Sequence, residues 1–360
     1  MSEQKGAETI PVRPGEDFDR ERLLRYLREH LEDVPEGSME VRQFPSGASN
    51  LTYLIRIGGW EAVLRRPPLG PLPPKAHDME REATLLKKLH PVYPLAPKPY
   101  LLCTDPGVLG TVFYVMERRK GVVLDGSFPA GVDGTEEVGR QISETAVKTL
   151  VRLHTIDWRE AGLESFGRPE GFLERQVGGW IRRYNKAKTD DIPEVEPLTR
   201  WLTDNIPQSP PATIIHNDFK LNNMLWDPPD WSSPVAVVDW EMTTIGDPLF
   251  DLAVSLSYWV RPDDPEELRS LLPTVTERNG FISRDTFLEY YAAQSGRDLS
   301  SIHFYMTFAY FKLAVIIQQI YARWKRGQTR DPRFASFGER VRGLIRYTTE
   351  LARTGRVSFS

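Results

Sequence analysis

The chain has 360 residues, enough for two domains or one large bilobal unit, and its 40% hydrophobic and 11% aromatic content excludes disorder of the whole chain. Its 46 Lys and Arg residues against 50 Asp and Glu give a formal charge of −4, which argues against nucleic acid or an anionic membrane surface as the main partner. The single cysteine, Cys103, excludes an intrachain disulfide, and the sequence has no Cys/His cluster that would suggest zinc. We therefore expect a cytoplasmic protein.

The first third of the chain predicts a flexible leader followed by a small lobe. Residues 1–17 are polar and lack the apolar stretch of a signal peptide. Asp19 is a candidate N-cap for the first helix of residues 18–117. The pattern predicts a helix at 20–32, strands at 40–44, 51–57 and 60–65, a helix at 77–89, and a hairpin of strands at 100–103 and 111–117. This β-β-β-α-β-β order describes a small antiparallel sheet with one main helix.

Residues 118–360 predict a larger, mostly helical lobe, so the expected fold class is α+β. The predicted elements are a helix from about 136 to 157, a mobile or substrate-facing stretch to about 189, strands at 212–216, 223–226 and 235–239, and helices from 250 onward. Asp247 before Pro248 is typical of a helix start. The apolar region 302–324 contains Lys312 and many aromatics at helical spacing, which favours a buried core helix over a membrane span.

The run from His216 to Asn223 carries the chemistry. It presents His-x-Asp-x-x-x-x-Asn, with Asp218 as the central residue, between two short apolar strands. Asp239 ends the next apolar run. Phosphoryl transfer needs a group that orients the attacking hydroxyl and oxygen ligands for a metal that bridges the phosphates. The ordered set of two aspartates and one asparagine therefore predicts a phosphotransferase centre.

The sequence resembles the aminoglycoside phosphotransferase and choline kinase superfamily, which has a protein kinase-like bilobal fold. It is most similar to the branch found as the kinase-like N-terminal domain of certain acyl-CoA dehydrogenases. The segments that carry the resemblance are SGASNLTYLIR (46–56), AVLRRPP (62–68), HDMEREATLLKKL (77–89), FYVMERRKG (113–121), LHTIDW (153–158), HNDFKLNNMLWD (216–227) and VVDWEMTTIGDPLFDLA (237–253).

The resemblance implies a role for each matched residue, with ATP and Mg²⁺ as cofactors. Asp218 would orient or deprotonate the acceptor hydroxyl, and Lys220 lies where many protein kinases place a lysine on the transferred phosphate. Asn223 and Asp239 would hold Mg²⁺. The nucleotide would be bound by the turn Ser46, Gly47, Ser49 and Asn50 over its phosphates, by Arg65 with its ion-pair partner Glu82, and by the hinge Glu117, Arg118 and Arg119 at the adenine.

Three features depart from the protein kinase pattern. Arg65 stands where most kinases have a lysine, which keeps the charge but changes its geometry. The loop over the phosphates has one glycine, Gly47, so this loop alone does not argue for nucleotide binding. The triplet Asp239-Trp240-Glu241 replaces Asp-Phe-Gly, as expected for a small-molecule kinase.

Several other residues have structural interpretations. We expect His216 and His154 to have structural roles, held by hydrogen bonds. Glu82 is either the ion-pair partner of Arg65 or a solvated charge on the surface of its helix. The basic groups Arg118-Arg119-Lys120 and Arg182-Arg183 are either solvated faces or a docking patch for an anionic substrate. We expect the aromatic residues of the 302–324 helix to pack in the core, and the alternative is that they line the acceptor pocket. These residues are Tyr305, Phe308, Tyr310 and Phe311.

The leading hypothesis is transfer of the γ-phosphate of ATP to a hydroxyl of a small-molecule acceptor. A nucleotide-binding pseudokinase is the alternative, motivated by Arg65 and the glycine-poor loop. A protein kinase fits less well because helices begin almost at once after Asp239. The family resemblance points to a hydroxyacyl-type acceptor by analogy, with an aminoglycoside as the alternative substrate.

Overall fold

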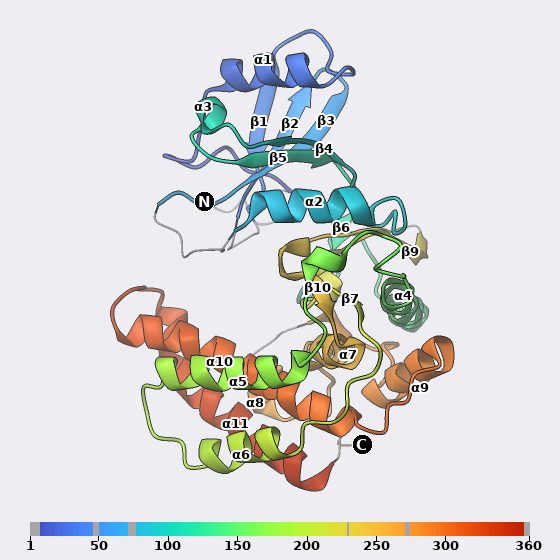
Figure 1. The fold of residues 1–360 in the computed structure, drawn as a ribbon, viewed down its shortest axis with the longest axis vertical. Helices are drawn as coiled ribbons and strands as arrows, with labels where there is room; N and C mark the ends of the chain where they lie inside the picture. Colours follow the sequence, from blue (N-terminus) through green and yellow to red (C-terminus); the bar gives the residue numbers. More distant parts are fainter. Residues whose placement is uncertain (1–7, 46–49, 71–76, 229, 271–273, 356–360) are drawn as a thin grey trace. The chain divides into compact units, whose positions relative to one another are not determined.

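The computed structural model describes residues 8–45, 50–70, 77–228, 230–270 and 274–355 (Figure 1). These form two compact units. The first contains residues up to Lys120 together with Val235–Glu241, and the second contains Gly121–Pro234 and the residues from Met242 onward. The sequence predicts a division after Glu117, with residues 235–241 in the second part. This segment joins the first unit because Val237 N donates to Leu95 O at 2.8 Å and Trp240 packs edge-on against Tyr93.

The first unit is built on a five-stranded antiparallel sheet in the order β1-β2-β3-β5-β4. Helix α1 lies on one face and α2 on the other (Figure 1). The predicted β-β-β-α-β-β order is confirmed, with a short helix α3 in place of the tight turn between the last two strands. The bounds are α1 Arg20–His30, β1 Met39–Gln43, β2 Leu51–Ile57, β3 Trp60–Arg66, α2 Met79–Leu89, β4 Pro99–Cys103, α3 Pro106–Leu109 and β5 Phe113–Glu117.

Strand alternation divides the small core between the two faces of the sheet. Tyr53, Ile55 and Leu64 turn toward α1, where they pack with Leu23 and Leu27. As predicted, Asp19 caps α1 by accepting a hydrogen bond from the Arg22 amide at 2.9 Å. The sheet therefore holds residues of β3 in a fixed register on the side of α2.

The expected flexible leader differs from what the structure shows over residues 8–17. Ile10 pairs with Gln43 through two backbone hydrogen bonds of 2.8 and 2.9 Å, and Glu16 O accepts a bond from the Tyr53 hydroxyl at 2.6 Å. The edge strand β1 offers unpaired backbone groups, which explains why the chain before α1 pairs with it. Residues 1–7 lie outside the described part.

The second unit is mostly helical, with two small sheets in the orders β10-β7 and β6-β8-β9, the last strand leading into the first unit. Its helices are α4 Glu136–His154, α5 Phe172–Ala187, α6 Val195–Asp204, α7 Pro248–Ser257, α8 Glu266–Arg269, α9 Arg284–Ser295, α10 Ile302–Lys325 and α11 Phe337–Thr354. Its strands are β6 Val122–Val123, β7 Thr213–Ile215, β8 Met224–Asp227, β9 Asp230–Val237 and β10 Thr244–Gly246. Short 3-10 turns cover Glu164–Phe166, Leu221–Asn223, Trp240–Met242, Val275–Glu277 and Pro332–Ser336.

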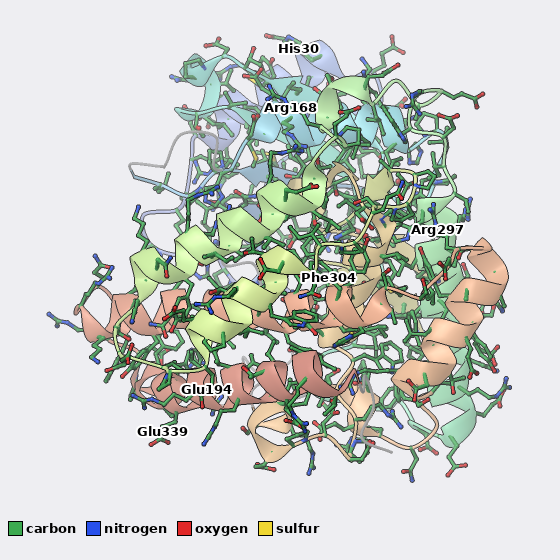
Figure 2. The ribbon with its side chains drawn as sticks, turned by 60° about the horizontal axis from the view of Figure 1, so that its bottom comes forward. His30, Arg168, Glu194, Arg297, Phe304 and Glu339 are labelled. Carbon is green, nitrogen blue, oxygen red and sulfur yellow. The ribbon has the colours of Figure 1, made fainter. Side chains whose placement is uncertain are left out.

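Helix α10 is the centre of the second unit, where it packs against α5, α7 and α11 (Figure 1). The predicted buried core helix is confirmed, since Tyr305, Phe308, Tyr310 and Phe311 have no exposed surface. Phe304, labelled in Figure 2, stacks on Trp201 of α6 with ring centres 6.0 Å apart. Within the described residues, no helix is long and apolar enough to cross a membrane.

Two sequence predictions for this unit were wrong. The stretch before residue 189, expected to be mobile or substrate-facing and without a predicted helix, contains α5, which buries Val177, Trp180 and Tyr184. Glycines 178 and 179 and the charged residues between these aromatics hid its helical periodicity. Strand β9 begins at Asp230 instead of at residue 235.

Candidate active site

In the first unit, Arg65 is the centre of a buried cluster of charges. It projects from β3, and its Nη1 lies 2.7 Å from Glu82 Oε1 of α2. Its Nη2 lies 3.4 Å from Asp239 Oδ1 and 3.9 Å from Glu241 Oε2. Both Arg65 and Glu82 are buried, so Glu82 is an ion-pair partner and not a solvated helix charge.

Burial and charge act in opposite directions on this cluster. Desolvation lowers the pKa of Arg65, but the surrounding carboxylates, first Glu82 and then Asp239 and Glu241, outweigh it and raise that pKa above its ordinary value. Desolvation raises the pKa of Glu82 to about 7, although Arg65 opposes this shift. Arg65 therefore stays charged, and three carboxylates face one buried cation.

Asn50 connects this cluster to the loop before α2. Its Nδ2 donates to Glu241 Oε2 at 2.7 Å, and its Oδ1 lies 2.8 Å from His77 Nδ1. Asn50 is thus anchored at the start of β2 beside the charged cluster. The other residues expected over the phosphates, Ser46, Gly47 and Ser49, lie outside the described residues.

The predicted hinge follows the end of β5. Glu117 N donates to Lys98 O at 2.8 Å, and its carboxylate pairs with Arg119 Nε at 2.9 Å. Arg118 pairs with Glu8 and lies over the Phe44 ring. The side chains of this segment are thus engaged within the unit.

In the second unit, the turn after β7 brings Asp218, Lys220 and Asn223 together. Lys220 Nζ lies 2.9 Å from Asp218 Oδ2, and Asn223 Nδ2 donates to the same oxygen at 3.0 Å and to Asp218 O at 2.8 Å. The Asp218 and Lys220 side chains each retain 23% of their exposure. Two donors therefore fix the Asp218 carboxylate while it stays accessible to a reactant.

A buried carboxylate, Asp251 of α7, fixes the backbone of this turn by hydrogen bonds. Its Oδ2 accepts the His216 amide at 2.8 Å and lies 3.0 Å from His154 Nε2, and its Oδ1 accepts the Asn217 amide at 2.7 Å. Burial raises the pKa of Asp251, but the bonds from His154 and His216 outweigh it and leave that pKa below its ordinary value. The carboxylate is therefore ionised, and it fixes two consecutive backbone amides.

His154 extends the support, as its expected scaffold role implies. Its Nδ1 lies 2.7 Å from the Tyr291 hydroxyl. Desolvation lowers the pKa of His154, so the neutral ring donates to Asp251 and accepts from Tyr291. Arg297, labelled in Figure 2, donates to His154 O at 3.0 Å. His216 is fully buried, which agrees with a structural role.

Backbone strain marks the same places. Among the described residues, three that are not glycine have positive φ, namely His77 at 58°, Asn217 at 66° and Asp239 at 67°. They adjoin Asn50, Asp218 and the Arg65 cluster. Such conformations persist where surrounding contacts fix them, and they concentrate at functional sites.

A pocket of about 220 Å³ lies within the second unit beside Lys220. The Lys220 ammonium also lies 5.0 Å from the centre of the Tyr258 ring. Asn222 Oδ1 is a buried acceptor without a hydrogen-bond partner. The lining residues are Leu124, Asp125, Lys220, Leu221, Asn222, Ser255, Tyr258, Trp259, Thr274 and Thr276.

Each unit by itself offers an oxygen donor of the kind that a hard cation prefers. In the first unit, Asp239 has a carboxylate that is 37% exposed. In the second, Asn223 has the oxygen of an amide whose nitrogen is engaged by Asp218. Mg²⁺ commonly takes one or two protein oxygens and completes its shell with water and phosphate. In the described ranges, no group of three or more His, Cys, Asp and Glu side chains forms a metal site by itself.

The basic groups have local explanations. Arg119 pairs with Glu117, and Lys120 Nζ lies 2.8 Å from Glu61 Oε2. Arg183 is exposed and lies over the Trp180 ring, with its guanidinium carbon 4.5 Å from the ring centre. Lys120 and Arg183 therefore fit solvated faces, whereas the Arg118 side chain is only 7% exposed and pairs with Glu8.

Sequence reasoning missed three residues of the site. Glu241 is visible only as the last residue of the Asp-Trp-Glu triplet. Asp251 lies within the matched segment 237–253, but nothing near it in the sequence signals its three partners. The sequence shows Lys312 as an isolated charge within an apolar helix, and this isolation is the only local signal of its role.

The comparisons place the chain among known phosphotransferases. Residues 40–299 match the family described as "Phosphotransferase enzyme family". "Acyl-CoA dehydrogenase family member 11" from Gallus gallus is 36% identical over 365 residues, which cover 98% of this chain and 45% of the relative. The chain thus spans less than half the length of that relative.

Solved structures agree in fold. A putative aminoglycoside phosphotransferase from Ralstonia eutropha has a TM-score of 0.81 at 29% identity, covering 94% of this chain and 99% of that one. Choline kinase from Cryptosporidium parvum has a TM-score of 0.61 at 14% identity, covering 93% and 96%. APH(4)-Ia in complex with AMP-PNP and hygromycin B has a TM-score of 0.59 at 15% identity, covering 93% and 99%. The kinase-like α+β fold is thus confirmed, and the chain belongs to the phosphotransferase enzyme family.

Proposed function

We propose that the protein transfers the γ-phosphate of ATP to a hydroxyl of a small-molecule acceptor in a Mg²⁺-dependent reaction. The observation that carries this proposal is the Asp218 carboxylate, held by Lys220 and Asn223 on a loop that Asp251 fixes from below. Positioning and electrostatics are the main contributions that a protein makes to phosphoryl transfer. This arrangement supplies both.

Each residue then has a role in the balanced reaction. The acceptor oxygen forms a bond to the γ-phosphorus while the bond from that phosphorus to the bridging oxygen of ADP breaks. Asp218 orients the acceptor hydroxyl and receives its proton, and Lys220 offsets the charge on the phosphoryl oxygens. Asn223 and Asp239 would hold Mg²⁺, which neutralises charge on the phosphates.

The nucleotide would use residues of the first unit. Arg65, held by Glu82, supplies the cation for the phosphates, and the turn with Ser46, Gly47, Ser49 and Asn50 covers them. The backbone of Glu117, Arg118 and Arg119 meets the adenine. The AMP-PNP complex of a protein with the same fold supports nucleotide use.

We assign the acceptor to the pocket beside Lys220. Its volume of about 220 Å³ suits a compact group, and Leu124, Tyr258 and Trp259 offer apolar surface to a carbon chain. Its wall carries one ammonium, Lys220, and one carboxylate, Asp125, so it is not the clearly acidic site that a polycation such as an aminoglycoside would favour. The acyl-CoA dehydrogenase names of the relatives support a hydroxyacyl-type acceptor.

The described Cys103 is buried and free, which is compatible with the cytoplasmic location expected from the sequence. Fractionation of cells that express the tagged protein would test this location. Recovery with a membrane or secreted fraction would contradict it.

A phosphate-transfer assay tests the proposal. The protein is incubated with Mg-ATP and a panel of hydroxylated metabolites and hydroxyacyl-CoAs, and phosphorylated product is measured by mass spectrometry. Asp218→Asn should lower turnover by about 10³-fold, the range of general-base loss, without a change in melting temperature. Asp227→Asn, at the exposed end of β8, is the matched control and should retain activity. Full turnover by Asp218→Asn would remove Asp218 from the mechanism.

A nucleotide-binding pseudokinase is the second candidate. It is favoured by the ion pairs of Arg65 with Glu82 and Asp239, which occupy the cation expected to bind phosphate. A thermal shift with Mg-ATP, together with no phosphate transfer to any acceptor in the panel, would establish it over the enzyme.

A further inference from the structure

Lys312 is a buried cation in the core helix α10. Only 6% of the residue is exposed. Its Nζ lies 5.4 Å from the centre of the Phe250 ring and 5.7 Å from that of Trp180, and it donates to the Asn217 carbonyl at 3.2 Å. The Lys312 ammonium therefore contacts the backbone of the residue that immediately precedes Asp218.

Fold stability alone does not explain a lysine here. A buried ammonium loses its hydration, and a methionine of similar length would fill the space between two aromatic rings without that loss. Desolvation lowers the pKa of Lys312 to about 8, which shows that its surroundings oppose the charge. Buried ionisable groups with perturbed pKa values concentrate at functional sites.

The groups that face this ammonium come from several elements. The carboxylates of Asp218 and Asp251 favour its charge, whereas Lys220 and Arg183 oppose it. The charges that stabilise the ammonium are thus those of the proposed catalytic aspartate and of the aspartate that supports the loop.

Asn217 is fixed from three directions. Its N–H donates to Asp251 Oδ1 at 2.7 Å, its Nδ2 donates to Met242 O at 2.9 Å, and its carbonyl accepts the bond from Lys312. Its φ of 66° is a conformation that a side chain other than glycine adopts at a cost. The Lys312 bond fixes the peptide that links Asn217 to Asp218, and so controls the direction in which the Asp218 side chain leaves the backbone.

We propose that Lys312 is a positioning residue for phosphate transfer: its ammonium holds the carbonyl of left-handed Asn217 and thereby aims the Asp218 carboxylate at the acceptor. The catalytic consequence rests on the proposed function. The structural consequence does not depend on it, so each has its own test.

The structural test is amide hydrogen exchange, measured by mass spectrometry on peptides that cover residues 213–223. Lys312→Met should increase exchange there by about tenfold, the effect of losing one fixing interaction, while the melting temperature stays the same or rises. Lys325→Met, at the exposed end of the same helix, should leave exchange unchanged. Equal exchange in Lys312→Met and the parent protein would overturn the proposal, whether or not the protein transfers phosphate.

The activity test uses Mg-ATP and the best acceptor from the panel. Lys312→Met should lower kcat by about tenfold and change KM for ATP by less than about threefold. The reason is that the variant loses the orientation of the Asp218 carboxylate but keeps the groups that bind ATP. Lys312→Arg retains the charge and should recover most of kcat, which a purely space-filling role would not allow. A kcat of Lys312→Met equal to that of Lys325→Met would overturn the catalytic role. If the parent protein transfers no phosphate, the proposed function fails and hydrogen exchange alone decides the role of Lys312.

Discussion

Each of the two units contains one buried charge with its own partners, and the kind of partner differs between them. In the first unit, the cation of Arg65 faces the carboxylates of Glu82, Asp239 and Glu241. In the second, the anion of Asp251 faces two peptide N–H groups and the ring of His154. The first brings one cation together with several carboxyl groups, and the second is a set of hydrogen bonds from neutral dipoles to one carboxylate.

This difference determines how each centre responds to change. Loss of Arg65 leaves the buried carboxyl group of Glu82 without its cation. Loss of the Asp251 charge leaves the backbone N–H groups of His216 and Asn217 without their charged acceptor. The first loss should affect the stability of the unit that contains it, and the second should mainly affect the order of the catalytic loop.

The largest effect is expected for Arg65→Met. Because Glu82 would remain buried without its cation, the free energy of unfolding in a urea titration should fall by about 3–5 kcal/mol. The double variant Arg65→Met with Glu82→Met should recover part of this loss. Arg56→Met, which removes an exposed arginine from the neighbouring strand, is the control and should have little effect. If Arg65→Met lowered the free energy of unfolding as little as Arg56→Met, the proposed difference between the Arg65 and Asp251 centres would be wrong.

A smaller loss of stability is expected for Asp251→Asn. The amide keeps one acceptor but loses the charge that serves two backbone donors, so unfolding should weaken by about 2–3 kcal/mol. Hydrogen exchange of the Asn217 amide should rise more than that of the α10 core. Asp331→Asn, on an exposed turn, should change neither measurement. Uniform exchange changes across the unit would show that Asp251 supports the whole fold and not the loop.

The smallest effect concerns the pH dependence contributed by His154. Burial lowers its pKa below the ordinary 6.5, so the unfolded chain takes up a proton below pH 6.5 that the folded protein does not bind. Stability from this group is thus present above pH 6.5 and is lost as the pH falls toward the folded pKa, by at most about 1.4 kcal/mol per pH unit. Unfolding titrations between pH 7.5 and 5.5 should show this loss in the parent protein and not in His154→Gln. Identical slopes would contradict it.

Local sequence rules determined most of the first unit and some elements of the second. In the first unit, the apolar pattern predicts the bounds of β2, and Asp19 caps α1. In the second, Asp247 caps α7 as its position before Pro248 predicts. The motif spacing also determined that Asp218 and Asn223 meet, because five residues of a tight turn bring both ends together. The helix α5 could not be found in this way, since its charged and glycine positions hide the apolar face that tertiary packing selects.

The sequence by itself determined which chemical groups this protein brings to its reaction, because those groups lie within one short motif and its near neighbours. Only the tertiary structure decided what holds them. Glu241 and Asn50 are 191 positions apart, and Lys312 reaches Asn217 across 95. Contacts at such separations follow from burial and packing of whole elements, which no local pattern encodes.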